Sequence, residues 1–276
     1  MCISLGYGLI IVSDYWAMQL NVYLLANGSL VRSIGRGGCG KGQFDFRCGG
    51  LCVSPDGDSV LVAEWHNRRV QQIRIVDGSW VRFVGEDVLN PEYVDCNADV
   101  IVVSESCNHI SVLSWADGSL CARFGGDGID PGYLSNPRGV RMLADGSGVV
   151  IADCYNNRLC VFTLGGEFVA TVGSKEQGLD FPYDVVECAS DGSFIVANHY
   201  ADNLIKLSRV GAMVEMYGKR GDGNGEFYRP TALAALPDGG MVVRELGGAR
   251  FQVFHDLELR KAWVIACVTV ARYGDA

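Results

Sequence analysis

The sequence has few of the features that mark secreted or membrane-spanning proteins. Its opening residues, MCISLGYGLIIVSDYW, contain no Lys or Arg, whereas a secretory leader begins with a basic segment. The longest apolar run near the end, from Ala262 to Ala271, is far shorter than the roughly 20 residues that cross a bilayer. We therefore expect a soluble, cytoplasmic protein with no membrane partner.

Paired cysteine motifs are also absent. The eleven cysteines form no CxxC pair and their number is odd, while Cys52, Cys160, Cys188 and Cys267 lie inside apolar runs. Because unpaired cysteine packs as a small hydrophobic residue, we expect buried free thiols rather than a disulfide framework. This usage of cysteine indicates a reducing compartment.

Signatures of catalysis and of nucleotide binding are lacking as well. The chain has no GxSxG motif and no Cys or Ser locally paired with a base, which argues against nucleophilic catalysis. The glycine-rich stretches GRGGCGKG and GKRGDGNG have no strand and helix around them, as a phosphate-binding loop would. We interpret them as connecting loops and expect no cofactor and no small-molecule substrate.

Basic residues are outnumbered, and prolines are few. With 32 acidic and 23 basic residues the formal charge is −9, which repels phosphate backbones unless basic residues gather on one face. In contrast, 36 glycines separate short apolar runs, against only 7 prolines. This texture is typical of an all-β protein.

One pattern recurs six times along the chain. An apolar run ends in a polar residue, a polar hairpin follows, and two alternating strands lead to a glycine. The closing polar residues, spaced 41 to 50 positions apart, are Asp14, Glu64, Glu105, Asp153, Asn198 and Glu245. Because Asp-Gly turns such as SPDGDS and PDGG add a strand before each run, one repeat holds four strands.

Four strands bury both of their faces only by packing against neighbouring sheets. The sequence therefore predicts an all-β, six-bladed β-propeller of four-stranded antiparallel blades, forming a single domain over residues 1–276. The blades fall at about 1–48, 49–93, 94–138, 139–183, 184–231 and 232–276. We expect the chain to begin on an innermost strand and to end on an outermost strand near 263–270.

The strings GDGNGEFYRP, PDGG, VVRE and FQVF, together with AEWHNRRV and ADCYNNRLCVF, resemble the NHL repeat. The resemblance covers essentially the whole chain, although the first and sixth units are degenerate. It implies a propeller that serves as a scaffold, or as the substrate-recruiting or signalling part of a larger protein such as a ubiquitin ligase.

The loops between blades and the hairpins between second and third strands are expected to emerge on one face, where loops on a rigid scaffold carry function. Residues just before the innermost strands are predicted to surround the channel mouth: Arg47, Glu92, Arg138, Tyr183 and Thr231. Other predicted binding residues on this face are Trp65, His66, Tyr155, His199, Tyr200 and Arg229. Because Tyr, Trp and Arg are common anchors in interfaces, the sequence favours a non-catalytic module that binds a protein or peptide.

The recurring carboxylates are expected to accept backbone N–H groups of the hairpin that follows each of them. A metal-dependent propeller lyase or hydrolase is an alternative, in which three hairpin histidines, His66, His109 and His199, hold the ion. They lie at different offsets within the repeat, so we favour solvated, repeat-derived histidines.

Single-stranded RNA is a second alternative partner. Arg36, Arg68, Arg138, Arg158 and Arg220 lie in the loops with Tyr and Trp nearby, as stacking on bases would require. The same loops carry many acidic residues, which reduces the expected release of counterions.

Overall fold

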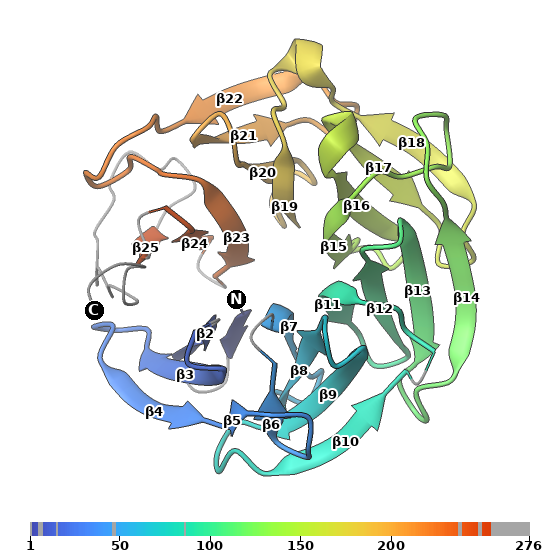
Figure 1. Ribbon diagram of the computed structural model, residues 1–276. Coiled ribbons are helices and arrows are strands. Elements are labelled where there is room, and N and C mark those ends of the chain that lie inside the picture. Colours follow the sequence, from blue (N-terminus) through green and yellow to red (C-terminus); the bar gives the residue numbers. More distant parts are fainter. Residues whose placement is uncertain are drawn as a thin grey trace.

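Six β-sheets surround a central axis in the computed structural model and form the blades of a propeller (Figure 1). The structure describes residues 2–4, 8–14, 16–45, 48–85, 87–236, 239–247 and 250–254. Within these ranges the only helical segments are two short 3₁₀ turns, η1 (Cys154–Asn156) and η2 (Lys175–Gln177). The predicted all-β, six-bladed fold is confirmed.

Each blade is a meander of antiparallel strands that follow one another in sequence. Blade 1 comprises β1 (Cys2–Ser4), β2 (Leu9–Asp14), β3 (Gln19–Leu24) and β4 (Leu30–Ile34). Blade 2 comprises β7 (Cys48–Val53), β8 (Ser59–Glu64), β9 (Arg69–Arg74) and β10 (Trp80–Val84). Blade 3 comprises β11 (Pro91–Cys96), β12 (Val100–Glu105), β13 (His109–Ser114) and β14 (Leu120–Gly125).

Blade 4 comprises β15 (Pro137–Met142), β16 (Val149–Asp153), β17 (Arg158–Phe162) and β18 (Phe168–Val172). Blade 5 comprises β19 (Pro182–Glu187), β20 (Phe194–Asn198), β21 (Asn203–Leu207) and β22 (Met213–Tyr217). Blade 6 comprises β23 (Pro230–Ala235), β24 (Met241–Glu245) and β25 (Arg250–Phe254). A short parallel pair, β5 (Arg36–Gly37) and β6 (Gln43–Phe44), lies in the loop between blades 1 and 2. The fourth strand expected near 263–270 lies outside the described residues.

The hydrophobic core consists of six clusters, and each lies between two neighbouring blades. Side chains of a strand point alternately to its two faces, so Leu9 and Ile11 of β2 pack toward blade 2. Ile10 and Val12 of the same strand pack toward blade 6. The first and last blades therefore share a core, and the ring closes.

The innermost strands begin one to three residues before the predicted blade boundaries, and in blades 3 to 6 each begins with proline. Just after that proline the pairing with the second strand shifts register. Such a β-bulge leaves a residue out of the ladder and redirects its side chain. Four residues predicted to precede these strands lie at the shift instead: Glu92, Arg138, Tyr183 and Thr231.

Side chains bridge the axis of the ring at this level. The hydroxyl of Tyr93 in blade 3 donates to the carbonyl oxygen of Thr231 in blade 6, the opposite blade, at 2.7 Å. The Asp184 carboxylate in blade 5 accepts from the guanidinium of Arg141 in blade 4 at 2.8 Å and from the N–H of Leu233 in blade 6 at 2.9 Å. These hydrogen bonds join blade 3 to blade 6 and blade 5 to blades 4 and 6.

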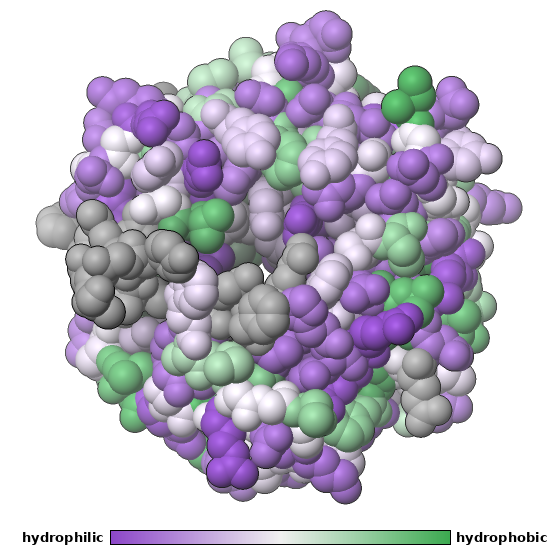
Figure 2. Space-filling view, viewed as in Figure 1, coloured by the Kyte–Doolittle hydropathy of each residue, from purple (hydrophilic) through white to green (hydrophobic). Residues whose placement is uncertain are grey.

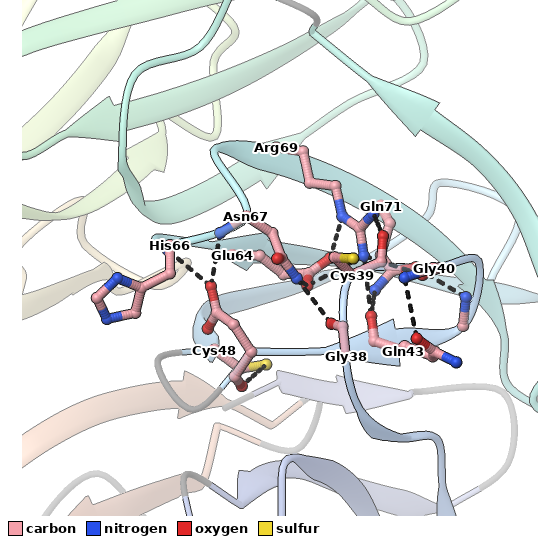
Figure 3. A network of polar contacts seen from close by, with 12 residues as sticks. Gly38, Cys39, Gly40, Gln43, Cys48, Glu64, His66, Asn67, Arg69 and Gln71 are labelled. Atoms are coloured by element: carbon pink, nitrogen blue, oxygen red, sulfur yellow. Dashed lines mark hydrogen bonds and ion pairs between the residues drawn. The ribbon is translucent and has the colours of Figure 1, made fainter.

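The recurring carboxylates hold the loop that leads into their own blade. In blade 2 the Arg69 guanidinium lies 2.8 Å from Glu64 and donates to the carbonyl oxygens of Cys39, Gly40 and Gln43 (Figure 3). We call such a carboxylate and its arginine a blade clamp. Equivalent blade clamps are Glu105 with Arg123, Asp153 with Arg158 and Glu245 with Arg250.

The predicted structural role of these carboxylates is thus correct, but most of the backbone donors are not the predicted ones. Among the described residues, Asp14 alone of these carboxylates accepts N–H groups of the following hairpin, those of Trp16 and Ala17. Asp153 accepts the N–H of Ser135, in the preceding loop, at 2.6 Å. The prediction was wrong on this point because the loop before the blade packs against the end of the second strand. Its N–H groups therefore lie within hydrogen-bond distance of the carboxylate.

Candidate binding face

Inter-blade loops and the hairpins between second and third strands meet on one face, as the sequence predicted. The N–H of Tyr155 donates to the carbonyl oxygen of Ser135 at 3.1 Å, and the N–H of His199 donates to that of Phe181 at 3.2 Å. Each loop is thereby attached to the hairpin of the blade that it enters. We call this side of the ring the loop face.

A second set of bonds joins each blade to the next. The Asn157 side chain of blade 4 accepts the N–H of Phe181 at 2.7 Å, and the Asp202 carboxylate of blade 5 accepts the N–H of Arg229 at 2.7 Å. Asn108 holds Asn136 in the same way. These contacts fix the residue before the proline that opens each innermost strand.

That residue has a left-handed backbone in four blades. Asn90 and Asn136 adopt it in blades 3 and 4 with φ of 54° and 53°, and asparagine tolerates it well. Phe181 and Arg229 adopt it in blades 5 and 6 with φ of 59° and 55°, where bulky side chains are strained. Strain of this kind costs of order 1–3 kcal/mol and often marks a functional position.

Four aromatic rings gather around the first of these strained residues, Phe181. Phe181 lies 4.6 Å from Tyr200 and 5.4 Å from Tyr155, between ring centroids. His199 lies 5.1 Å from Tyr200 and 4.9 Å from Tyr183. We call Tyr155, Phe181, Tyr183, His199 and Tyr200 the aromatic platform.

The platform is open at one side and anchored at the other. Tyr155 and Tyr200 are 63% and 55% exposed. Figure 2 shows pale and light green side chains together near the top of the view, where blade 5 lies in Figure 1. His199 is buried, and its Nδ1 lies 3.2 Å from the carbonyl oxygen of Pro230. Burial lowers the pKa of His199 below its ordinary value, so its ring is neutral at pH 7.

Cationic groups border the platform. The Arg138 guanidinium lies 5.2 Å from the Tyr183 ring centroid and pairs with Glu92 at 2.5 Å. Arg229 is exposed, 5.8 Å from the ring of Tyr228, and makes no ion pair with any residue that the structure describes. The platform therefore combines flat apolar surface with an available positive charge.

Other predicted binding residues lie apart from this group or below the surface. Glu92 is buried, because Arg138 draws it into an ion pair, so it is not an open mouth residue. Trp65 and His66 pack on each other in blade 2, with ring centroids 4.5 Å apart, and the Trp65 indole N–H donates to Ser106 at 3.0 Å. Arg47 lies outside the described residues.

The structure does not bring the three hairpin histidines together. His109 Nδ1 lies 2.9 Å from the carbonyl oxygen of Cys107 in blade 3, while His66 and His199 belong to blades 2 and 5. Across the described parts of the chain, no three His, Cys, Asp or Glu residues are grouped as a metal would require.

Two of the arginines considered for RNA are occupied by contacts within the protein. Arg158 lies in a blade clamp and also donates to the carbonyl oxygens of Ile129 and Tyr133. Arg138 pairs with Glu92. The basic surface available to a phosphate backbone is smaller than the sequence suggests.

Sequence reasoning missed Phe181, the residue on which the platform centres. A signal was present, because Phe181 precedes Pro182 at the place where Asn90 and Asn136 precede Pro91 and Pro137. A large side chain at a repeat position that holds asparagine in blades 3 and 4 is a departure from the local rule.

The comparisons with known proteins agree with the fold. Residues 134–162 match the NHL repeat; they include β15, β16 and β17 with the Asp153 and Arg158 blade clamp. No curated protein matches the chain. Among the described residues no helix is long and apolar enough to cross a membrane. The chain is thus a six-bladed β-propeller in which residues 134–162, within blade 4 and the end of the loop before it, match the NHL repeat.

Proposed function

We propose that the chain is a non-catalytic binding module that holds a protein or peptide on its loop face. The observation that supports this most directly is the aromatic platform, with exposed Tyr155 and Tyr200 on a backbone held by hydrogen bonds between blades. Tyrosine offers a large contact area at a small cost in side-chain entropy, so it is a frequent anchor in protein interfaces.

A rigid support adds to the argument. The loop that carries Phe181 is bonded to Asn157 of one hairpin and to His199 of the next. A surface already fixed before binding loses little conformational freedom when a partner docks. This suits a scaffold or recruiting module within a larger assembly, such as a ubiquitin ligase or a signalling protein.

The cellular setting belongs to the same proposal. Nine described cysteines are free, and five of them are buried, among them Cys52, Cys160 and Cys188, which agrees with the expectation for free thiols. Buried thiols without disulfides fit a reducing, cytoplasmic environment.

The test is a comparison of partner binding between the wild type and a Tyr155→Ala/Tyr200→Ala double variant. A protein captured by the immobilised wild type is identified, purified and titrated against both. We expect its dissociation constant to rise at least about tenfold, since truncating interface anchors commonly costs more than 1.4 kcal/mol.

A Val210→Ala/Met213→Ala variant is the matched control, because it removes two exposed side chains near the outer edge of blade 5. It should bind the partner as the wild type does. A partner that binds the double tyrosine variant with unchanged affinity would show that the loop face around the platform is not the binding surface.

A further inference from the structure

We infer that the segment held on the aromatic platform is an acidic peptide with an aromatic residue beside its carboxylates. The inference rests on the proposed function and specifies the chemistry of the partner. In this arrangement the aromatic ring of the peptide packs on Tyr155, Phe181 and Tyr200, and its carboxylate meets Arg229.

The first reason is the pair of strained residues. Phe181 and Arg229 occupy the position that asparagine fills in blades 3 and 4, at the same left-handed backbone. Asparagine would relieve the strain, so the phenyl ring and the guanidinium occupy these positions at a local cost in free energy. An aromatic surface and a cation are thus placed side by side at neighbouring blades.

The second reason is the state of the charges. Arg229 is exposed and has no ion-pair partner among the described residues. The buried carboxylate of Asp202 is already engaged, because it accepts the Arg229 N–H and lies 3.9 Å from Arg220. An incoming carboxylate therefore finds a guanidinium that no internal acid neutralises.

One nearby acid opposes an acidic ligand and defines a useful variant. Asp180 immediately precedes Phe181, is partly exposed, and makes no ion pair with a described residue. Its charge should weaken the binding of an acidic peptide. Asp180→Asn should consequently tighten that binding, in the opposite sense to Arg229→Ala.

The test uses short capped peptides as probes. Acetyl-Gly-Gly-Phe-Glu-Glu-Gly-Gly-amide is titrated against the full chain, beside peptides with Gln or Lys for Glu and with Ala for Phe. We expect the Glu peptide to bind at least about tenfold more tightly than the Lys peptide and to weaken as salt is added. The Ala peptide should lose affinity to a similar extent.

Two protein variants separate binding from folding. Arg229→Ala should reduce affinity for the Glu peptide about tenfold. Phe181→Asn should reduce it similarly while leaving the unfolding temperature equal or higher, since asparagine accepts φ of 59°. Arg209→Ala, in the turn between β21 and β22 and paired with Asp145 and Glu187, is the control and should bind as the wild type does.

Several results would overturn the inference. Peptide affinity that is independent of peptide charge, or unchanged by Phe181→Asn, would refute the acidic, aromatic peptide as the ligand. It would not contradict the proposal that the loop face binds a protein. Absence of binding by every peptide refutes it as well, even if the captured protein still depends on Tyr155 and Tyr200. Tighter binding of oligouridine that depends on the same residues would assign the platform to single-stranded RNA instead.

Discussion

Arg158 illustrates how one partly buried side chain joins a blade to the loop before it. Its guanidinium lies 2.8 Å from Asp153 and also donates to the carbonyl oxygens of Ile129, Asp130 and Tyr133. Burial raises the pKa of the Asp153 carboxyl above its ordinary value even in the presence of this arginine. Arg158 therefore favours the charged form of a carboxyl whose ionisation burial disfavours.

Replacement of Arg158 by methionine should destabilise the protein by about 3–5 kcal/mol, because it leaves a buried carboxylate without its cation. The folded-state pKa of Asp153 should rise further, so its contribution to stability falls as the pH increases above the ordinary value of 3.8. The loss should consequently be larger at pH 7 than at pH 4. Urea unfolding at the two pH values measures it.

Lys219→Met provides the comparison, since Lys219 pairs with Glu226 at 3.4 Å and the two side chains are 77% and 32% exposed. Exposed ion pairs contribute about 0–1 kcal/mol. If both substitutions cost the same, the blade clamp contributes no more than a surface pair.

At this scale the sequence identified much of the candidate site. Tyr155, His199 and Tyr200 were predicted on the loop face as hairpin residues, and Tyr183 as a residue preceding an innermost strand; their rings lie close to one another or to Phe181. Glu92 was predicted to surround the channel mouth, and its side chain is buried. Its burial depends on Arg138 of the next blade, a contact between repeats that a pattern within one repeat does not contain.

Among the elements, the innermost strands of neighbouring blades approach each other closely at two glycines. A Cβ atom built on Gly49 of β7 would lie 2.1 Å from the backbone oxygen of Glu92 in β11. At Gly139 of β15 the nearest atom is Asp184 Oδ1, at 2.3 Å. Glycine therefore allows neighbouring blades to approach each other near the axis.

Gly49→Ala should destabilise the propeller by about 1–3 kcal/mol, because the added methyl group meets backbone of the adjacent blade and the two strands must separate. Thermal unfolding measures the change. Gly165→Ala makes the same chemical change in a turn where the nearest atom would be Thr163 Oγ1 at 3.7 Å. That control should stay within about 0.5 kcal/mol of the wild type, and equal losses at both sites would refute the steric account.

Strand order and number were accessible from the sequence, whereas the bulges were not. The repeat spacing and the Asp-Gly turns predict the meander of each blade, because both depend on short-range chemistry. The register shift after Pro137 or Pro182 arises where the innermost strand meets its neighbours around the axis. Blade boundaries drawn from the sequence therefore fell up to three residues late.

For the molecule as a whole, the cores between blades make the ring one structural unit. Each of the six clusters draws side chains from two neighbouring blades, so the core formed by the described residues lies between blades. Stability in such repeats comes largely from the interfaces between units. A covalent link across one interface should accordingly affect the unfolding of the entire ring.

Cys52 in β7 and Cys96 in β11 offer such a link, with their Sγ atoms 3.3 Å apart. Oxidised glutathione, as the electron acceptor, should convert the two thiols to a disulfide, and its own disulfide is reduced to two glutathione thiols that take up the two protons. The hydrogen bond with Cys96, followed by burial, raises the pKa of the Cys52 thiol well above its ordinary value. Because the thiolate is the nucleophile, the reaction should be slow at pH 7 and faster as the pH rises.

The cross-link spans 44 positions of sequence, for which the loss of chain entropy in the unfolded state corresponds to at most about 4 kcal/mol. Since the blades share their cores, the unfolding midpoint should rise as one transition when followed by circular dichroism, which reports on every sheet. Cys96→Ser should abolish the shift. A second transition at the original midpoint would mean that distant blades unfold independently of the linked pair, and the ring would then be a chain of separable units despite its shared cores.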